Sequence, residues 1–292
     1  MIKALLKGYA KQIETAFDAY FPESGSEYKE VIEAMWYSFA AGGKRIRPAL
    51  LLEFYKVCGG TGEGAVNFAL ALEMIHTYSL IHDDLPCMDN DDFRRGRPAC
   101  HKAYGENLAL LAGDALLTEG FSVAAHTKNI PAERTVRAIL ALSEAAGVHG
   151  MIGGQVIDIK NELGDPATET ILQTYRLKTG ALLRAAATIG CILAGADEKT
   201  VSAAEEYANC LGLAFQIIDD ILDETGDEKL LGKPTGSDEK NNKVTYVTRV
   251  GLSAAKAKAE ELTASALAAL SAINGNTENL AALTAYLLER NY

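Results

Sequence analysis

Two groups of aspartates are the residues most able to carry chemistry in this sequence. Asp219 and Asp223 stand four positions apart in an otherwise apolar run, so on a helix they would share one face, with Asp220 turned away by about 100°. Such a pair of like charges is unfavourable unless a cation lies between the carboxylates. Oxygen ligands without cysteine favour Mg²⁺. The pattern therefore predicts a helix that binds Mg²⁺ through Asp219 and Asp223.

The second group, Asp83, Asp84 and Asp89, follows an apolar helical stretch over 67–81. Pro86 should end or bend this helix directly after the first two carboxylates, which lets the three side chains converge. Mg²⁺ normally keeps several waters and completes its octahedron with phosphate oxygens of a substrate. Either group alone is also explained as an acidic helix end in solvent. Two such groups, each at the end of an apolar helix, favour a metal-dependent site.

Basic residues stand in groups that match these acids. Lys44 and Arg47 are three apart at a predicted helix start, where free backbone N–H groups also attract an anion. The forked guanidinium group suits bidentate phosphate contacts, whereas lysine acts as a point charge. Further phosphate-binding candidates are Arg94, Arg95, Lys178, Lys233 and Lys243. An isolated residue of either type is usually a solubilising surface charge, so only the grouping points to a ligand.

The composition is that of a folded protein with a sizeable core, because 48% of the 292 residues are hydrophobic and 23% are charged. The net charge of −11 argues against nucleic acid as a partner, since duplex binding requires a broad basic surface. It does not exclude an anionic small substrate, because carboxylates loaded with divalent cations attract anions.

Five scattered cysteines include no Cys-x-x-Cys pair, and the chain has no signal-like start. We therefore expect a protein of the reducing cytoplasm without a disulfide framework or a zinc knuckle. The longest apolar runs, 108–117 and 185–196, are interrupted by Asp114 or too short to span a bilayer, so no stable membrane insertion is expected. Both runs are predicted to be buried helices.

Helical periodicity dominates the chain, with apolar residues three and four apart in Ala- and Leu-rich segments. The predicted helices are 2–20, 28–41, 65–83, 107–128, 131–147, 169–193, 198–223, 253–273 and 277–290. No convincing strand is found, so the predicted fold class is all-α. Several helices lack a clean polar stripe, which indicates a large bundle around a central helix or burial against a second subunit. Length alone allows one large domain or two small ones, but no Pro/Ser-rich linker divides the chain, which favours one domain over 1–292.

Two long polar stretches, 89–98 and 226–243, are predicted to be loops. Long polar loops inside a helical bundle are often functional, and a solvated connection is the alternative. The first carries Arg94 and Arg95 and the second carries Lys233, so both hold phosphate-binding candidates.

Taken together, these motifs resemble the short-chain trans-prenyl diphosphate synthases, the family of farnesyl and geranylgeranyl diphosphate synthases. The run 73–98 is similar to the first aspartate-rich region of its bacterial and plastid members, in which four rather than two residues separate the aspartates. Segments similar to the other family motifs occur in the expected order, at 42–48, 153–155, 177–180, 215–223, 232–233 and 243–246. The resemblance covers residues 42–246, is highly specific, and is strongest to the bacterial farnesyl-producing members.

The resemblance implies an isoprenoid-synthase helical bundle, a single polyprenyl synthase domain with a central catalytic cavity, and a homodimer. Isopentenyl diphosphate would be held by Lys44, Arg47, His76 and Arg95. Mg²⁺ bridging an allylic diphosphate would be ligated by Asp83, Asp84, Asp89 and Asp219, with Asp223 as a further ligand. Direct contacts to the same diphosphate would come from Arg94, Lys178 and Lys233. Thr179 and Gln216 would line the reacting end.

The implied reaction condenses isopentenyl diphosphate with dimethylallyl or geranyl diphosphate. An allylic C–O bond ionises only if the departing diphosphate is strongly stabilised, which metal ions and cationic side chains achieve. The allylic cation must then be kept from water, so the cavity should be apolar. The released diphosphate is the expected acceptor of the final proton, so no conventional general base is required.

Three residues before the first aspartate group need separate interpretation. His76 is either a hydrogen-bonded core histidine or a phosphate ligand, and the resemblance favours the ligand. His82 is expected to be structural. Tyr78, five residues before Asp83, should project into or beside the cavity that holds the growing chain. In the family a bulky residue there limits product length, so Tyr78 favours a fifteen-carbon product, with a core aromatic as the alternative.

Other functions remain in competition with farnesyl diphosphate synthesis. A geranylgeranyl diphosphate synthase shares every motif and differs only in the depth of its cavity. A metal-dependent phosphohydrolase would use His76, His82 and Asp83 but leaves the second aspartate group and the basic groups unexplained. A terpene cyclase would keep the aspartates without needing a pocket for isopentenyl diphosphate. A catalytically inactive partner subunit is expected to lack an aspartate group, and both are present.

Overall fold

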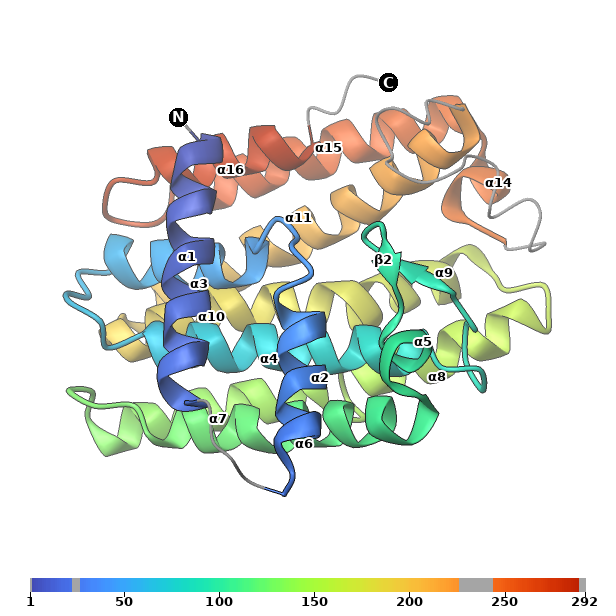
Figure 1. Ribbon diagram of the computed structural model, residues 1–292. Helices are drawn as coiled ribbons and strands as arrows, with labels where there is room; N and C mark the ends of the chain where they lie inside the picture. Colours follow the sequence, from blue (N-terminus) through green and yellow to red (C-terminus); the bar gives the residue numbers. More distant parts are fainter. Residues whose placement is uncertain (1, 23–26, 226–243, 289–292) are drawn as a thin grey trace.

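The computed structural model describes residues 2–22, 27–225 and 244–288, and almost all of its regular structure is helical (Figure 1). The all-α prediction is confirmed. The described helices are α1 (Ile2–Tyr20), α2 (Lys29–Phe39), α3 (Ile46–Val57), α4 (Val66–Asp83), α5 (Cys100–Tyr104), α6 (Glu106–Ala125), α7 (Ala132–Ala146), α8 (Met151–Glu162), α9 (Thr168–Thr174), the π-helical turn η1 (Tyr175–Gly180), α10 (Ala181–Ala194), α11 (Glu198–Thr225), α14 (Tyr246–Val250), α15 (Leu252–Leu270) and α16 (Glu278–Leu288).

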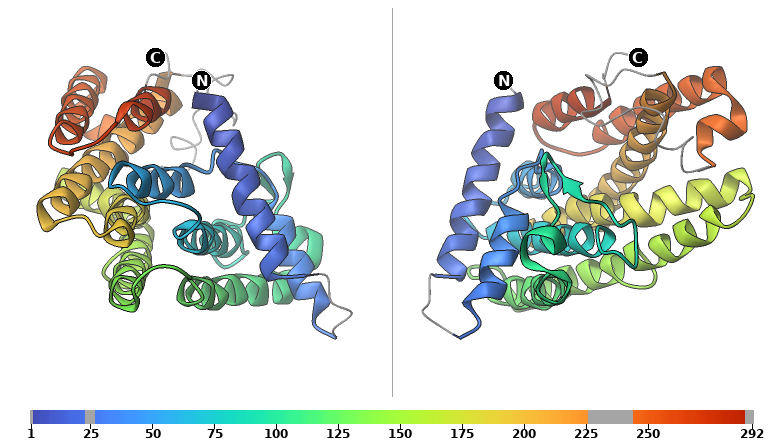
Figure 2. Two further views of the ribbon diagram at one scale, coloured as in Figure 1. Left: turned by 90° about the vertical axis from the view of Figure 1, so that its left-hand side faces the viewer. Right: turned by 45° about the vertical axis from the view of Figure 1, so that its right-hand side comes forward.

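Two helices, α4 and α10, form the interior of the bundle (Figures 1 and 2). Helix α4 packs against α1, α2, α3, α6 and α10, while α10 packs against α3, α4, α7 and α11. Both are buried on nearly every side, as the missing polar stripe predicts. Gly190 lets α10 approach α3 closely, because a Cβ at this position would lie 2.5 Å from the carbonyl oxygen of Leu51. Helix α1 runs across the bundle (Figure 1).

Most predicted helices are observed within a few residues of their expected ends, but the predicted ranges do not include α3, of which only the start was predicted, nor α5, α8 and α14. Helix α8 begins with two glycines in its first turn, which lowers its helix propensity. Helix α3 contains Pro48 near its start, where proline is tolerated because the first turn has no internal partner for that N–H. The segment predicted as one helix over 169–193 is helical throughout, but the π-helical turn η1 interrupts it.

A small hairpin is the exception to the helical structure. Strands β1 (Phe93–Arg94) and β2 (Arg97–Pro98) pair antiparallel inside the stretch predicted as a loop, so the expectation of no strand was wrong here. The turn residues Arg95 and Gly96 have φ of 54° and 76°, and tight two-residue hairpin turns require such positive values. The hairpin places Arg94 and Arg95 on an ordered element beside the end of α4.

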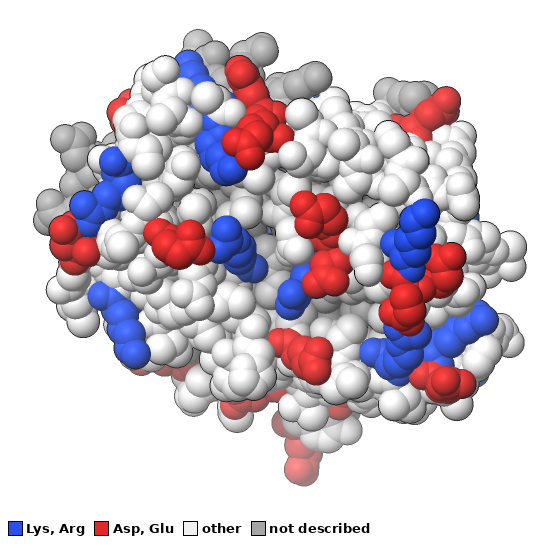
Figure 3. Space-filling model, turned by 180° about the vertical axis from the view of Figure 1, so that it is seen from behind, with Lys and Arg blue, Asp and Glu red and all other residues white. Residues whose placement is uncertain are grey.

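Two described helical segments, Glu106–Ala125 and Thr168–Ala194, are long and apolar enough to cross a membrane by length and composition alone. Core helices of soluble proteins meet the same criterion, and Thr168–Ala194 is mostly buried inside this bundle. On the face shown in Figure 3, the described basic side chains lie interspersed with acidic ones. That face therefore presents no continuous basic surface of the kind that duplex binding requires.

Candidate active site

A cavity of about 480 Å³ lies beside α4 and is lined also by α3, α6, α8 and η1. Its polar lining includes five residues that the sequence analysis singled out: Arg47, His76, Asp83, Lys178 and Thr179. Its apolar lining comes from Leu117 of α6 and from one side of α8, with Met151, Ile152, Val156 and Ile159. The structure thus joins ionic groups from distant parts of the chain to an apolar wall within one cavity.

The first aspartate group lies where α4 ends. Asp83 is the last residue of the helix and Asp84 caps it, as Pro86 predicts. The chain then turns back, and the N–H of Asp89 donates to the carbonyl oxygen of Asp83 at 2.8 Å. This turn returns Asp89 to the helix end across the four intervening residues. Burial, opposed by the nearby charge of Lys178, raises the pKa of Asp83 to about 6, so a cation beside this carboxylate would be stabilising.

Arg94 does not project freely from its hairpin. Its Nε donates to the two carboxylate oxygens of Asp84 at 3.0 and 3.2 Å, and its Nη2 contacts the same carboxylate. Asp91 adds a weaker contact at 3.4 Å. Arg94 therefore neutralises the buried Asp84, and it must exchange this partner before it can contact a diphosphate.

Three predicted phosphate ligands converge from different elements: Arg47 from the first turn of α3, His76 from α4 and Arg95 from the hairpin turn. Burial is the main cause that holds the pKa of His76 well below its ordinary value, and the charges of Arg47 and Arg95 add to it. The imidazole is therefore neutral at pH 7. Burial also lowers the pKa of both arginines. Such crowding of positive groups is typical of a site for an anion.

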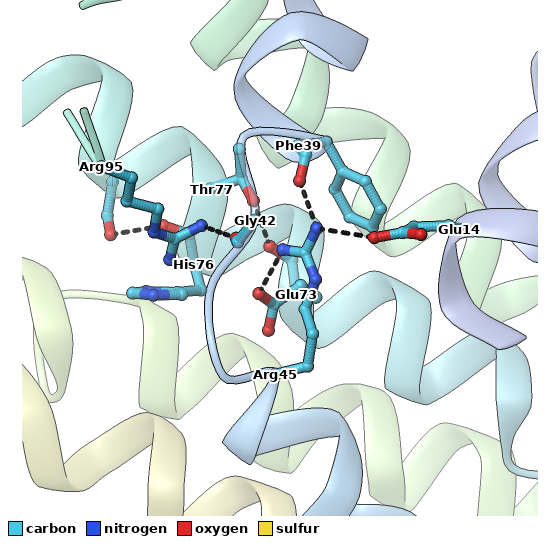
Figure 4. Close-up of polar contacts among 9 residues, drawn as sticks. Glu14, Phe39, Gly42, Arg45, Glu73, His76, Thr77 and Arg95 are labelled. Carbon is cyan, nitrogen blue, oxygen red and sulfur yellow. Dashed lines mark hydrogen bonds and ion pairs between the residues drawn. The ribbon is translucent and has the colours of Figure 1, made fainter. Parts of the chain in front are cut away.

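The chain segment before α3 is fitted closely around Arg95. The Nη1 of Arg95 donates to the carbonyl oxygen of Gly42 (Figure 4). Gly43 leaves room for the guanidinium group, since a Cβ there would lie 2.6 Å from its central carbon. Lys44 is exposed, and its ammonium group lies 6.0 Å from the ring centre of Tyr286 on α16. Lys44 thus stands at the edge of the basic group rather than in the cavity wall.

Lys178 and Thr179 lie in η1, a π-helical turn of a kind that is rare and frequently found at functional sites. Lys178 Nζ donates to Asp158 Oδ2 at 2.7 Å, and Thr179 Oγ1 donates to Gln216 Oε1 at 2.8 Å. The close approach of α8 depends on Gly154, because a Cβ there would lie 2.2 Å from the backbone nitrogen of Lys178. The turn is therefore held between α8 and α11.

The second aspartate group lies on α11 as predicted, with Asp219 partly exposed and Asp223 buried. Asp220, which the helical geometry turns away from them, accepts hydrogen bonds from the Tyr175 hydroxyl at 2.6 Å and from the Tyr246 N–H at 3.2 Å. Asp220 thus has a structural role, because it joins α11 to η1 and α14. Asp219 follows Gln216 by three residues, which places it one helical turn beyond the contact with Thr179.

Asp83, Asp84 and Asp89 lie near the same helix end, but their side chains do not form a closed metal cage. Within the part of the chain that the structure describes, no three His, Cys, Asp or Glu side chains are grouped closely enough to hold a metal ion. The physical reason is that Asp84 is paired with Arg94 and that unscreened carboxylates repel one another. The oxygen donors still fit Mg²⁺, which binds through one or two carboxylates, waters and substrate phosphates rather than a full protein cage. Lys233 and the predicted loop 226–243 lie outside the described residues.

Comparison with known proteins agrees with this geometry. Residues 28–283 match the polyprenyl synthetase family. The chain belongs to this family. It is 46% identical over 263 residues to a geranylgeranyl diphosphate synthase of Cyanophora paradoxa, covering 89% of this chain and 88% of the relative. It is 44% identical over 259 residues to a farnesyl diphosphate synthase of Geobacillus stearothermophilus, covering 88% of this chain and 87% of the relative.

A solved structure of an FPP/GFPP synthase from Zymomonas mobilis superposes with a TM-score of 0.89 at 34% identity, and the match covers 98% of each chain. The resemblance inferred from the motifs is therefore confirmed, and the chain is a prenyltransferase with trans-prenyl synthase activity. The named relatives divide between farnesyl and geranylgeranyl producers. They do not distinguish which product length this prenyltransferase makes.

Several residues of the prenyltransferase site escaped the sequence analysis. Asp158 follows Gln155 by three residues on α8, and this spacing places it on the same helix side, which was an available signal. Arg45 and Glu73 form a buried ion pair that no local pattern indicated. His82, which is expected to be structural, has its Nε2 3.1 Å from the carbonyl oxygen of Leu110 on α6, and it also lines the cavity.

Asp158→Asn should lower kcat by about ten-fold or more, because Lys178 loses the charge that holds its ammonium group at the cavity wall. Steady-state turnover with circular dichroism as a check of folding is the measurement. Glu169→Gln is the matched control. Glu169 lies on α9 and pairs with Arg176 of η1, so this substitution removes an acidic partner of η1 at the exposed surface. Equal kcat in the Asp158 variant and the wild type would remove Asp158 from the site.

Proposed function

We propose that this prenyltransferase condenses isopentenyl diphosphate with dimethylallyl and geranyl diphosphates to give farnesyl diphosphate, with Mg²⁺ as cofactor. The main support is the cavity in which Asp83 and Lys178 share a wall with Arg47 and His76 and continue into an apolar surface. A phosphohydrolase does not need that apolar surface, and a terpene cyclase does not need the basic groups Arg47 and His76 for a second diphosphate. The proposed condensation needs both the apolar surface and these basic groups.

The chain's own groups divide between the two diphosphates. Arg47, His76 and Arg95, with Lys44 at the edge, would hold isopentenyl diphosphate, and the neutral His76 would donate a hydrogen bond to it. Mg²⁺ held by Asp83, Asp84, Asp89, Asp219 and Asp223 would supply charge stabilisation for the departing allylic diphosphate.

Lys178 and Thr179 lie at the cavity wall, where a leaving group anchored near Asp83 would be in reach. Arg94 and Lys233 are proposed to add cationic contacts to this leaving group. Gln216 would orient Thr179 through the hydrogen bond between them. The apolar lining from α6 and α8 would keep water from the allylic cation. We expect the released diphosphate to take up the final proton.

Incubation of the purified protein with Mg²⁺, isopentenyl diphosphate and dimethylallyl diphosphate should yield farnesyl diphosphate, identified by mass spectrometry after dephosphorylation. Removal of divalent metal with EDTA should abolish the condensation, and added Mg²⁺ should restore it, because the leaving group loses its main stabilising charge. Formation of free isoprenoid alcohol without condensation, measured before the dephosphorylation step, would support a phosphohydrolase. Cyclised hydrocarbon would support a terpene cyclase.

Tyr78 is the proposed limit on product length. Its ring lines the cavity, is only 6% exposed and meets the His82 ring edge-on at 5.6 Å between centres. Its hydroxyl has no hydrogen-bond partner among the described residues, so the ring is held by packing. A twenty-carbon product is the second candidate, because a relative named geranylgeranyl diphosphate synthase shares 46% of its residues with this chain over the matched region.

Tyr78→Ala should shift the product from fifteen to twenty or more carbons, because loss of the ring deepens the cavity that receives the growing chain. Tyr78→Phe is the control, since it keeps the ring and removes only an unpartnered hydroxyl. Products of both variants and of the wild type are compared by chromatography. Unchanged product length in Tyr78→Ala would exclude Tyr78 as the limit.

A homodimer, in the reducing cytoplasm, is also proposed. Helix α6 is apolar enough to satisfy a membrane-span criterion, yet only 39% of its most apolar window is buried within the chain. Leu110 and Leu111 are about half exposed on this helix. A second copy is the proposed partner for the uncovered side of α6. The five cysteines are all free, which agrees with a reducing compartment.

Light scattering coupled to size exclusion should therefore give about twice the chain mass of 31.2 kDa. Leu111→Asp should reduce this mass toward that of one chain, because a charge would be buried in the interface. Leu163→Asp is the control, since Leu163 is 87% exposed just beyond α8. A dimer that survives Leu111→Asp would place the interface elsewhere.

A further inference from the structure

The turn that leads into α3 has a backbone conformation that needs support. Gly42 and Gly43 both have positive φ, and Arg45, at the N-cap of α3, has a φ of 49° in the left-handed region. A residue other than glycine is uncommon in this region and persists where its surroundings determine the conformation. The surroundings of the Arg45 side chain supply such a determinant.

The Arg45 side chain is buried, with 1% of its surface exposed, and its guanidinium group is fixed from several directions (Figure 4). Nη1 donates to Glu73 Oε1 on α4 at 2.8 Å, and Nη2 donates to the carbonyl oxygen of Phe39 at the end of α2. Nη2 also lies 3.6 Å from the carboxylate of Glu14 on α1. The guanidinium carbon stands 4.7 Å from the centre of the Phe39 ring. One side chain therefore links α1, the end of α2 and α4 to the start of α3.

The sequence neighbours of the Arg45–Glu73 pair are the groups proposed to bind phosphate. Lys44 and Arg47 flank Arg45, and Glu73 stands three residues before His76 on the same side of α4. Any shift of the ion pair would move the start of α3 relative to α4. It would thereby change the distance between the basic groups and the imidazole.

Glu73 also balances charge within the basic group. Burial lowers the pKa of Arg47 and of Arg95, and the attraction of Glu73 opposes this change for both. Arg95 is in turn attached to the same turn through the carbonyl oxygen of Gly42. The cationic side chains are thus kept together and charged before an anion is bound.

We propose that the Arg45–Glu73 ion pair is a positioning pair that sets the spacing of the isopentenyl diphosphate pocket, an inference that rests on the proposed function. A buried ion pair often contributes little net stability compared with apolar packing, and in some proteins such a polar pair instead specifies how the elements pack. Displacing a binding group by about 1 Å lowers catalytic efficiency steeply. Arg45 and Glu73 act through the residues that flank them rather than by contact with substrate.

The test measures KM for isopentenyl diphosphate and for geranyl diphosphate separately in Arg45→Gln, Arg45→Lys and Glu73→Gln. We expect KM for isopentenyl diphosphate to rise by about ten- to a hundred-fold in Arg45→Gln, while kcat and KM for geranyl diphosphate change by less than about two-fold. Arg45→Lys retains the charge and should rescue part of the loss. Glu73→Gln keeps an acceptor of the same shape and tests the pair if the Arg45 variants do not fold.

Arg134→Lys is the matched control, because Arg134 is a partly buried arginine that donates to the carbonyl oxygen of Ala194 at the far end of α10. It should leave both KM values unchanged. Variants that lose thermal stability with no selective change in KM for isopentenyl diphosphate would overturn the proposal and leave Arg45 a purely structural residue. Failure of the wild type to consume isopentenyl diphosphate would instead contradict the proposed function.

Discussion

Like charges that lie close together inside a helical bundle repel one another, and the ionic groups of this structure are arranged around that constraint. The structure meets it by giving reactive charges opposite partners within the fold. Arg94 pairs with Asp84, Lys178 pairs with Asp158, and the arginines of the basic pocket share Glu73. Since unpaired charges are costly to bury, such pairing keeps the groups inside the bundle at a tolerable free energy.

Close helix packing is the second condition for the site. Gly154 brings α8 against η1, and Gly190 brings α10 against α3, and in each case a Cβ would overlap backbone atoms of the neighbour. The apolar wall of the cavity and its cationic groups therefore come within one small volume. Substituting either glycine would force these packed elements apart without altering any charged side chain.

Residue type and spacing predicted most of the helices, the ends of α4 and α11, and the presence of separate acidic and basic groups, because these features depend on local sequence. Contacts between distant segments cannot be predicted from local spacing, because they depend on how the helices pack. The Arg45–Glu73 pair joins positions 28 residues apart, and the Asp158–Lys178 pair depends on how α8 packs on η1. The tight turn that produces β1 and β2 was predicted only as a polar loop. The engagement of Asp84 by Arg94 also could not be read from the sequence, because it follows from the direction in which that hairpin projects.

The π-helical turn η1 makes the length of one segment as important as its composition. A π-turn amounts to one residue inserted into an α-helix, and the widened turn accommodates this residue locally. Deleting a single residue between Tyr175 and Gly180 would allow a regular α-helix and remove the widened turn that carries Lys178 and Thr179. The contacts of Lys178 with Asp158 and of Thr179 with Gln216 would then be lost, while α10 could keep its buried surface. Among homologous chains, insertions and deletions should therefore be absent from this stretch and accumulate in surface connections such as 126–131.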